Sequence, residues 1–306
     1  MSGAARGPEK KLGLAQALHD STANVSAAPL APAPADMARR RHYGLDWLRI
    51  LAFALLILFH IALVFSPGHW VIKSPVTFGW LAWPMALLTP WRLSLLFAVS
   101  GYASAHLFAR EGSPRAFARS RARRLLMPLA FGMVVLVPVE MWALVSSAGY
   151  THGLGHFLLQ DYWRSGIFYG HRFPSWEHLW FVAYLASYSF VLAALLAVPG
   201  QWFDRWMHRA AAWLGIGRRL LFVPVAVLAG VKLSLLFVVP EEQGLFTDWA
   251  GHALYMPMFL FGFALGRCPP LWEPLRCQWK GALARAMVAG MAYALMETHW
   301  EVPPPL

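Results

Sequence analysis

The sequence is poor in charged residues, especially acidic ones, and in cysteine. Asp, Glu, Lys and Arg make up only 13% of the 306 residues, whereas about a quarter of the residues in a soluble domain are charged. The two cysteines, Cys268 and Cys277, are too few for a disulfide framework or a metal cluster. The basic residues around them place both in the cytosol, where thiols stay reduced. Because no glycine-rich phosphate loop, nucleophile elbow or metal-ligand spacing occurs, we expect neither a bound metal nor a bound cofactor.

Hydrophobic residues, in contrast, make up 58% of the chain, and 16 residues are Trp. An apolar run of about 20 residues is long enough to cross a bilayer, and Trp and Tyr crowd many ends of such runs here, as at membrane interfaces. We predict an all-α fold, a polytopic transmembrane helical bundle with about seven spans. The second span is too long for one straight helix and is expected to kink or lie at the surface around Trp83-Pro84. The predicted spans cover about residues 45–66, 80–108, 125–147, 178–198, 220–238, 251–267 and 282–298.

Residues 1–40 are rich in Ala, Pro and Ser. Such a composition cannot bury a core and predicts a disordered cytosolic tail. The tail contains no apolar segment of the kind found in cleaved secretory signals, so the first span is expected to act as the insertion signal. Residues 41–300 form the predicted transmembrane domain.

Basic residues alternate in density between the connections of the predicted spans. Arg39 to Arg41 precede the first span, and the segments after the second, fourth and sixth spans are rich in Arg and Lys. Residues 67–79, 148–177 and 241–248 contain few basic residues or none. Because Lys and Arg favour the cytosolic side, the N-terminus is predicted to be cytosolic. This distribution indicates that the net charge of +11 reflects membrane topology and not nucleic-acid binding.

The first predicted span carries Arg49 and His60 on one face. They lie eleven positions apart, which is almost three turns at about 3.6 residues per turn. An ionisable side chain inside a span is a functional candidate, and histidine is suited to proton transfer near neutral pH. Asp46 can pair with Arg49 along the helix. Two interpretations are open at this point: a polar functional path, or an arginine that extends to the headgroups and a histidine that bonds a neighbouring helix.

Several blocks of the sequence, taken in order, resemble the membrane acyltransferase 3 family, and most closely its glucan biosynthesis branch. The first is residues 41–49 (RHYGLDWLR) with Phe59-His60. The others are residues 90–101 (PWRLSLLFAVSG), 119–129 (RSRARRLLMPL) and 173–181 (FPSWEHLWF), with a weaker match at 248–250 and 259–263. The resemblance covers about residues 41–267. Members of this family usually have about ten helices, so the seven predicted here would make this a shortened member.

The resemblance implies an integral membrane O-acyltransferase of the bacterial inner membrane. Such an enzyme takes an acyl group from cytosolic acyl-CoA, as co-substrate, to a hydroxyl of an envelope glycan or a similar acceptor. Two other functions stay open: a transporter or export component for a glycan or lipid-linked precursor, and a truncated, inactive relative that acts as a partner subunit.

The resemblance also assigns residues. His60 and Arg49 would be catalytic, with His60 as general base and Arg49 on the acyl donor or on developing oxyanion charge. The substrate-binding candidates are Asp46, Arg92, Arg119, Arg121, Arg123, Arg124, Glu177 and His178. Arg92 would bind the acyl donor, the four-arginine cluster would hold the CoA phosphates or simply mark the cytosolic side, and Glu177 and His178 would contact the acceptor or serve as interfacial structure. Glu140, in the third span, is expected to be structural.

Overall fold

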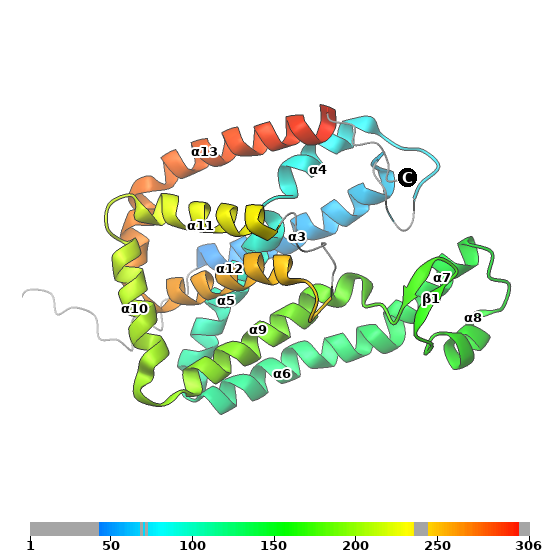
Figure 1. Cartoon of the computed structure of the whole chain (residues 1–306), viewed down its shortest axis with the longest axis horizontal. Coiled ribbons are helices and arrows are strands. Elements are labelled where there is room, and N and C mark those ends of the chain that lie inside the picture. The colour runs from blue at the N-terminus through cyan, green and yellow to red at the C-terminus, as the bar shows by residue number, and fades with distance from the viewer. Residues whose placement is uncertain (1–42, 68–69, 71–72, 236–243, 300–306) are drawn as a thin grey trace, which may run out of the picture. The chain divides into compact units, whose positions relative to one another are not determined.

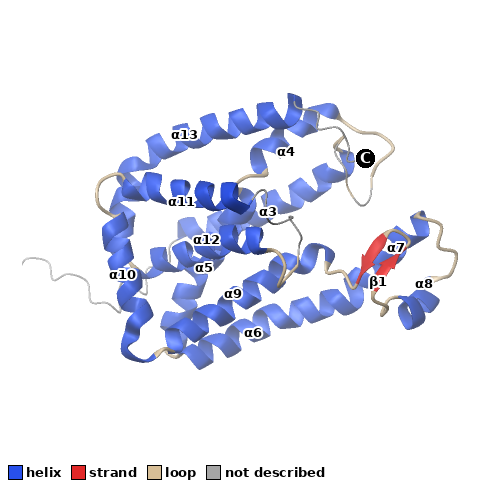
Figure 2. Ribbon diagram, viewed as in Figure 1, coloured by secondary structure: helices blue, strands red, loops and turns tan. Residues whose placement is uncertain are grey.

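The computed structural model describes residues 43–67, 70, 73–235 and 244–299. In these residues the fold is helical apart from one short β-hairpin (Figure 2). The elements in chain order are α3 (Tyr43–Phe65), η1 (Gly79–Leu81), α4 (Ala82–Leu88), α5 (Arg92–Glu111), α6 (Pro114–Phe131), η2 (Gly132–Leu136), α7 (Val137–Ser147), α8 (Leu154–His156), η3 (Phe157–Asp161), β1 (Gly166–Phe168), β2 (His171–Phe173), η4 (Glu177–Leu179), α9 (Trp180–Ala197), η5 (Pro199–Gln201), α10 (Trp202–Leu214), α11 (Arg219–Leu235), α12 (Trp249–Arg267), η6 (Pro269–Leu271) and α13 (Trp272–His299).

Three stretches of helix are long and apolar enough to cross a membrane. They are Gly79–Glu111, Pro114–Ser147 and Glu177–Ala197. A fourth span is possible if η5–α10 and α11, which are bent by 112° at their junction, count as one broken span. The expectation of an all-α membrane protein is therefore confirmed in its general form for the part of the chain that the structure describes.

Three predicted boundaries are wrong. Helix α13, which contains the last predicted span, begins at Trp272 and not near residue 282. The other two differ for local reasons. The helix that contains the third predicted span begins at Pro114 and not near residue 125, because Ser113 caps it through the amide of Ala116 and Pro114 occupies its first position. The basic segment is therefore helical. The break in the second predicted span falls between α4 and α5, at residues 89–91, and not at Trp83-Pro84. Pro84 lies in the first turn of α4, where a missing amide hydrogen costs little.

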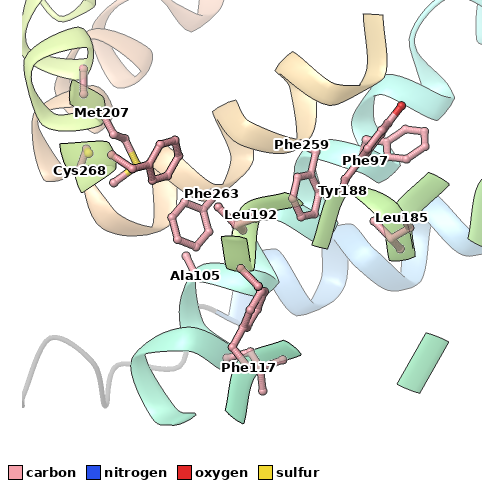
Figure 3. Packing of buried hydrophobic residues seen from close by; sticks show 14 of the residues in the cluster. Phe97, Ala105, Phe117, Leu185, Tyr188, Leu192, Met207, Phe259, Phe263 and Cys268 are labelled. Atoms are coloured by element: carbon pink, nitrogen blue, oxygen red, sulfur yellow. The ribbon is translucent and has the colours of Figure 1, made fainter. Parts of the chain in front are cut away.

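Helices α5 and α12 lie side by side at the centre of the described region (Figure 1). A Cβ atom built on Gly101 would lie 1.9 Å from the carbonyl oxygen of Phe259, and one built on Gly262 would lie 1.8 Å from that of Ala98. Only glycine allows the two backbones to approach so closely. The core around this contact contains several buried aromatic side chains, among them Phe97, Phe117, Phe259 and Phe263 (Figure 3).

The segment between α7 and α9, which the sequence marked only as a connection between two predicted spans, forms a small folded unit. Strands β1 and β2 pair antiparallel, and their turn residues Tyr169 and Gly170 both have positive φ, 49° and 81°, as tight hairpin turns require. Phe157 and Phe173 are buried in a second apolar cluster with residues of α7. This unit fixes the start of the segment 174–178, which leads into α9.

Candidate active site

His60 lies on α3, and its hydrogen bonding defines the state of its ring. Its Nδ1 is 2.7 Å from the carbonyl oxygen of Leu56, one turn earlier. A carbonyl oxygen only accepts hydrogen bonds, so Nδ1 carries the proton and Nε2 of the neutral ring has a free lone pair. The side chains of Trp70 and His178 lie next to it, with ring centroids 5.8 and 5.3 Å from that of His60. The ring of His60 can therefore act as a base through Nε2, and it lies among aromatic side chains.

His178 connects His60 to a carboxylate from another helix. Its Nδ1 lies 3.4 Å from Oε1 of Glu140 on α7, and its ring also contacts Trp70, at 5.3 Å between centroids. The ring of His178 thus contacts the ring of His60 on one side and the carboxylate of Glu140 on the other, and the three residues come from segments that are far apart in the sequence. From the sequence alone Glu140 is expected to be structural, because an isolated acidic residue in an apolar run gives no sign of its partner.

Glu177 joins this group from the residue before His178. One ligand atom each from Glu140, Glu177 and His178 lies within 4.8 Å of the others. Such a mixed carboxylate and imidazole set could hold a divalent cation, which the sequence did not predict. The direct contact between Glu140 and His178 also allows a plain ion pair when His178 is protonated.

Arg92, at the start of α5, lies beside the same part of α3. Its guanidinium carbon is 3.3 Å from the ring centroid of Phe59, the residue before His60. Its Nη1 donates to Oγ1 of Thr89 at 3.2 Å, whereas its buried Nε has no hydrogen-bond partner in the described part of the protein. Arg92 therefore brings positive charge and a spare donor next to His60.

The four arginines proposed for CoA binding do not share one environment. Arg121 is buried, donating from Nε to Oγ of Ser189 at 2.9 Å and from Nη2 to Oγ of Ser100 at 3.0 Å. These bonds tie α6 to α9 and α5. The side chains of Arg119, Arg123 and Arg124 are exposed, and CoA binding by these three stays a prediction. Asp46 and Arg49 lie on α3 with His60, but their side chains lie outside the described residues.

Comparison with known proteins shows the family of the chain. The family described as the acyltransferase domain, Acyl_transf_3, matches residues 42–301. Proteins named glucans biosynthesis protein C from Salmonella paratyphi B, Salmonella heidelberg and Salmonella schwarzengrund are each 25% identical over 278 residues, which is 85% of this chain and 67% of theirs. No solved structure matches. Because the family match covers most of the sequence, the chain belongs to the acyltransferase 3 family of membrane acyltransferases.

Proposed function

We propose that the protein transfers an acyl group from cytosolic acyl-CoA to a hydroxyl of an envelope glycan. The observation that carries this proposal is the ring of His60, with Nδ1 held by Leu56 and Nε2 left free, next to the Glu140–His178 pair. A general base within reach of the acceptor hydroxyl is what ester formation requires. The glycan acceptor is suggested by the name of the relatives, glucans biosynthesis protein C.

The proposed reaction needs one proton carrier and one site for negative charge. Nε2 of His60 removes the proton of the acceptor hydroxyl as its oxygen attacks the thioester carbonyl carbon. The C–O ester bond forms, the C–S bond breaks, and His60 returns the proton to the departing CoA sulfur. Arg92 and Arg49 stabilise the oxyanion on the carbonyl oxygen or bind the donor. The Glu140 carboxylate holds His178 beside His60 and offsets the positive charge of a protonated His178, which would otherwise disfavour the positive charge that His60 carries in between.

The direction of transfer rests on the proposed topology, with about seven spans in the bacterial inner membrane and a cytosolic N-terminus. Arg49 is then close to the cytosolic end of α3, and His60 lies in its outer half. The exposed Arg119, Arg123 and Arg124 face the side from which CoA arrives. The acceptor would reach His60 from the outer side, past the segment that carries Glu177 and His178.

Acyl-CoA-dependent ester formation in purified membranes tests the proposal. We expect His60→Gln to lower the transfer rate about 100-fold or more while the variant still inserts into the membrane. His208→Gln is the matched control, because His208 makes the same bond to a carbonyl one turn earlier, 2.8 Å from Asp204, but on exposed α10. An unchanged rate in His60→Gln would refute the assigned base, and glycan uptake into proteoliposomes without any acyl-CoA would favour a transporter.

Activity in EDTA, measured in the same membranes, distinguishes an ion pair between Glu140 and His178 from a cation site. With an ion pair between Glu140 and His178, we expect transfer to continue in EDTA. If activity is lost in EDTA and restored by a divalent cation, a metal bound by Glu140, Glu177 and His178 replaces the ion pair in the mechanism.

A further inference from the structure

A cavity of about 400 Å³ opens next to the candidate active site. One wall is formed by Arg172 and residues 174–177, and the facing wall by Gly244 and Thr247. The volume lies in the range of small-molecule sites, about 300–1,000 Å³. Glu177 belongs both to this cavity and to the group with Glu140 and His178. A molecule in the cavity therefore contacts Glu177. The next residue in the sequence is His178, whose ring is 5.3 Å from that of His60.

Both walls are fixed by packing and hydrogen bonds. The first follows buried Phe173 at the end of the hairpin, and Oγ of Ser175 donates to Oε1 of Glu177 at 2.6 Å while it accepts from the Glu177 amide at 3.2 Å. The second is attached to the buried hydroxyl of Tyr184 on α9, which lies 3.2 Å from the Gly244 carbonyl oxygen and donates to Asp248 at 2.6 Å. A cavity with fixed walls is preorganised for a ligand.

The residues that line the cavity favour the sugar acceptor over CoA as its ligand. Among the lining residues that the structure describes, Arg172 and Glu177 contribute one charge of each sign, so these residues supply no net charge for the phosphates of CoA, which call for several cations. It offers the indole of Trp176, hydroxyls of Ser175 and Thr247, and a carboxylate held in place. An aromatic plane with planar hydrogen-bonding groups suits the apolar face and the hydroxyls of a sugar ring.

We propose that this cavity binds the acceptor as a neutral, polyhydroxylated sugar ring, with Trp176 against the ring face and Arg172 and Glu177 on its hydroxyls. The inference rests on the proposed function, since it makes the cavity the acceptor site of the acyl transfer. Glu177 has a φ of 41°, a conformation that non-glycine residues adopt rarely and mainly where function requires it. That strain fits a residue whose carboxylate must face the cavity.

A labelling experiment tests binding without requiring acyl transfer. Thr247→Cys is made in purified full-length protein that also carries Cys277→Ser, and its rate of maleimide labelling is measured with methyl β-D-glucopyranoside, CoA or inorganic phosphate. We expect the glucoside to slow labelling at least about threefold near saturation, and CoA and phosphate to leave it unchanged. Thr151→Cys, exposed outside the cavity, is the control and should show no protection.

Adding Trp176→Ala to the Thr247→Cys protein should raise the glucoside concentration needed for half-maximal protection about tenfold, whereas His60→Gln should leave that concentration unchanged. Protection by CoA or phosphate alone, or by none of the three compounds, would overturn the proposal. Protection by the glucoside in a protein that transfers no acyl group would keep the sugar site and reject the proposed reaction. Acyl transfer to a glycan, with no protection of Thr247→Cys by the glucoside, would keep the proposed reaction and reject the sugar site.

Discussion

At the scale of single residues, Glu140 determines the electrostatics around His178, because its carboxylate lies 3.4 Å from the ring Nδ1. Glu140→Gln keeps the size of the side chain and removes its charge. We expect the maximal rate of transfer to fall about 10- to 100-fold with little change in the KM for acyl-CoA. Glu297→Gln, on exposed α13, is the control, and equal rates for the two variants would show that the pair has no role in proton transfer.

Arg121 illustrates a residue whose role lies in the helix packing. It is buried against Ser189 and Ser100, and Arg121→Met leaves those hydroxyls without their donor. We expect a loss of about 1–3 kcal/mol in stability, seen as a lower midpoint of thermal unfolding in detergent. Arg123→Met, at an exposed position on the same helix, should leave the midpoint unchanged. A shift of equal size in both variants would contradict this assignment.

At the scale of elements, the contact between α5 and α12 depends on glycine. Gly262→Ala places a methyl group 1.8 Å from a backbone carbonyl oxygen of α5, so the helices must separate. We expect about 1–3 kcal/mol of destabilisation, measured by thermal unfolding in detergent. Gly230→Ala on α11 is the matched control, because a Cβ there meets nothing within 4 Å. It should be neutral or slightly stabilising.

The folded unit between α7 and α9 contains a carboxylate that should make it sensitive to acid. The hydroxyl of Tyr150 donates to Asp161 at 2.5 Å, and Arg164 pairs with the same carboxylate. The Tyr150 hydrogen bond, with help from Arg164 and His156, holds the pKa of Asp161 below its usual value. Burial, with the Asp161 hydrogen bond, raises the pKa of Tyr150 to about 12.

A lowered carboxylate pKa stabilises the folded state above the unfolded pKa of about 3.9, and the gain is lost as pH falls through the lower folded value. We expect hydrogen exchange in residues 148–176, corrected for intrinsic rates, to be constant from about pH 5 to pH 8 and to accelerate below about pH 4. Asp161→Asn should exchange faster at pH 7 and lose most of this pH dependence. If Asp161→Asn still shows faster exchange below about pH 4, another group is responsible for the acid response.

At the scale of the whole molecule, the proposed topology can be tested with the native thiols. Cys268 is buried, and burial raises its pKa to about 11, so it should not react. Cys277 is exposed and is proposed to be cytosolic. In intact cells, we expect a membrane-impermeant maleimide to leave Cys277 unlabelled until the membrane is opened. Thr151→Cys, made in a Cys277→Ser background, should label at once, and the opposite pattern would reverse the topology.

Much of the fold could be predicted because helix formation in a bilayer follows from local composition. Apolar runs must satisfy their backbone hydrogen bonds internally, and a helix does so within one segment. The helices α3, α9, α11 and α12 accordingly match their predicted ranges to within a few residues. The start of α6 at Pro114 and amphipathic α10 were missed, because a run of apolar residues marks neither a capped polar helix nor an amphipathic one.

The sequence by itself determined the helical class and the family, and it predicts a role for His60, since these depend on the order of residues along single segments. Only the tertiary structure decided that Glu140 partners His178, that Arg121 is buried apart from its basic neighbours, and that residues 172–177 face Gly244 and Thr247 across a cavity. Each of these joins side chains from segments far apart in the chain. Such contacts depend on how the helices pack. The close approach of α5 and α12 at Gly101 and Gly262 is part of that packing, and no local sequence pattern encodes its distances.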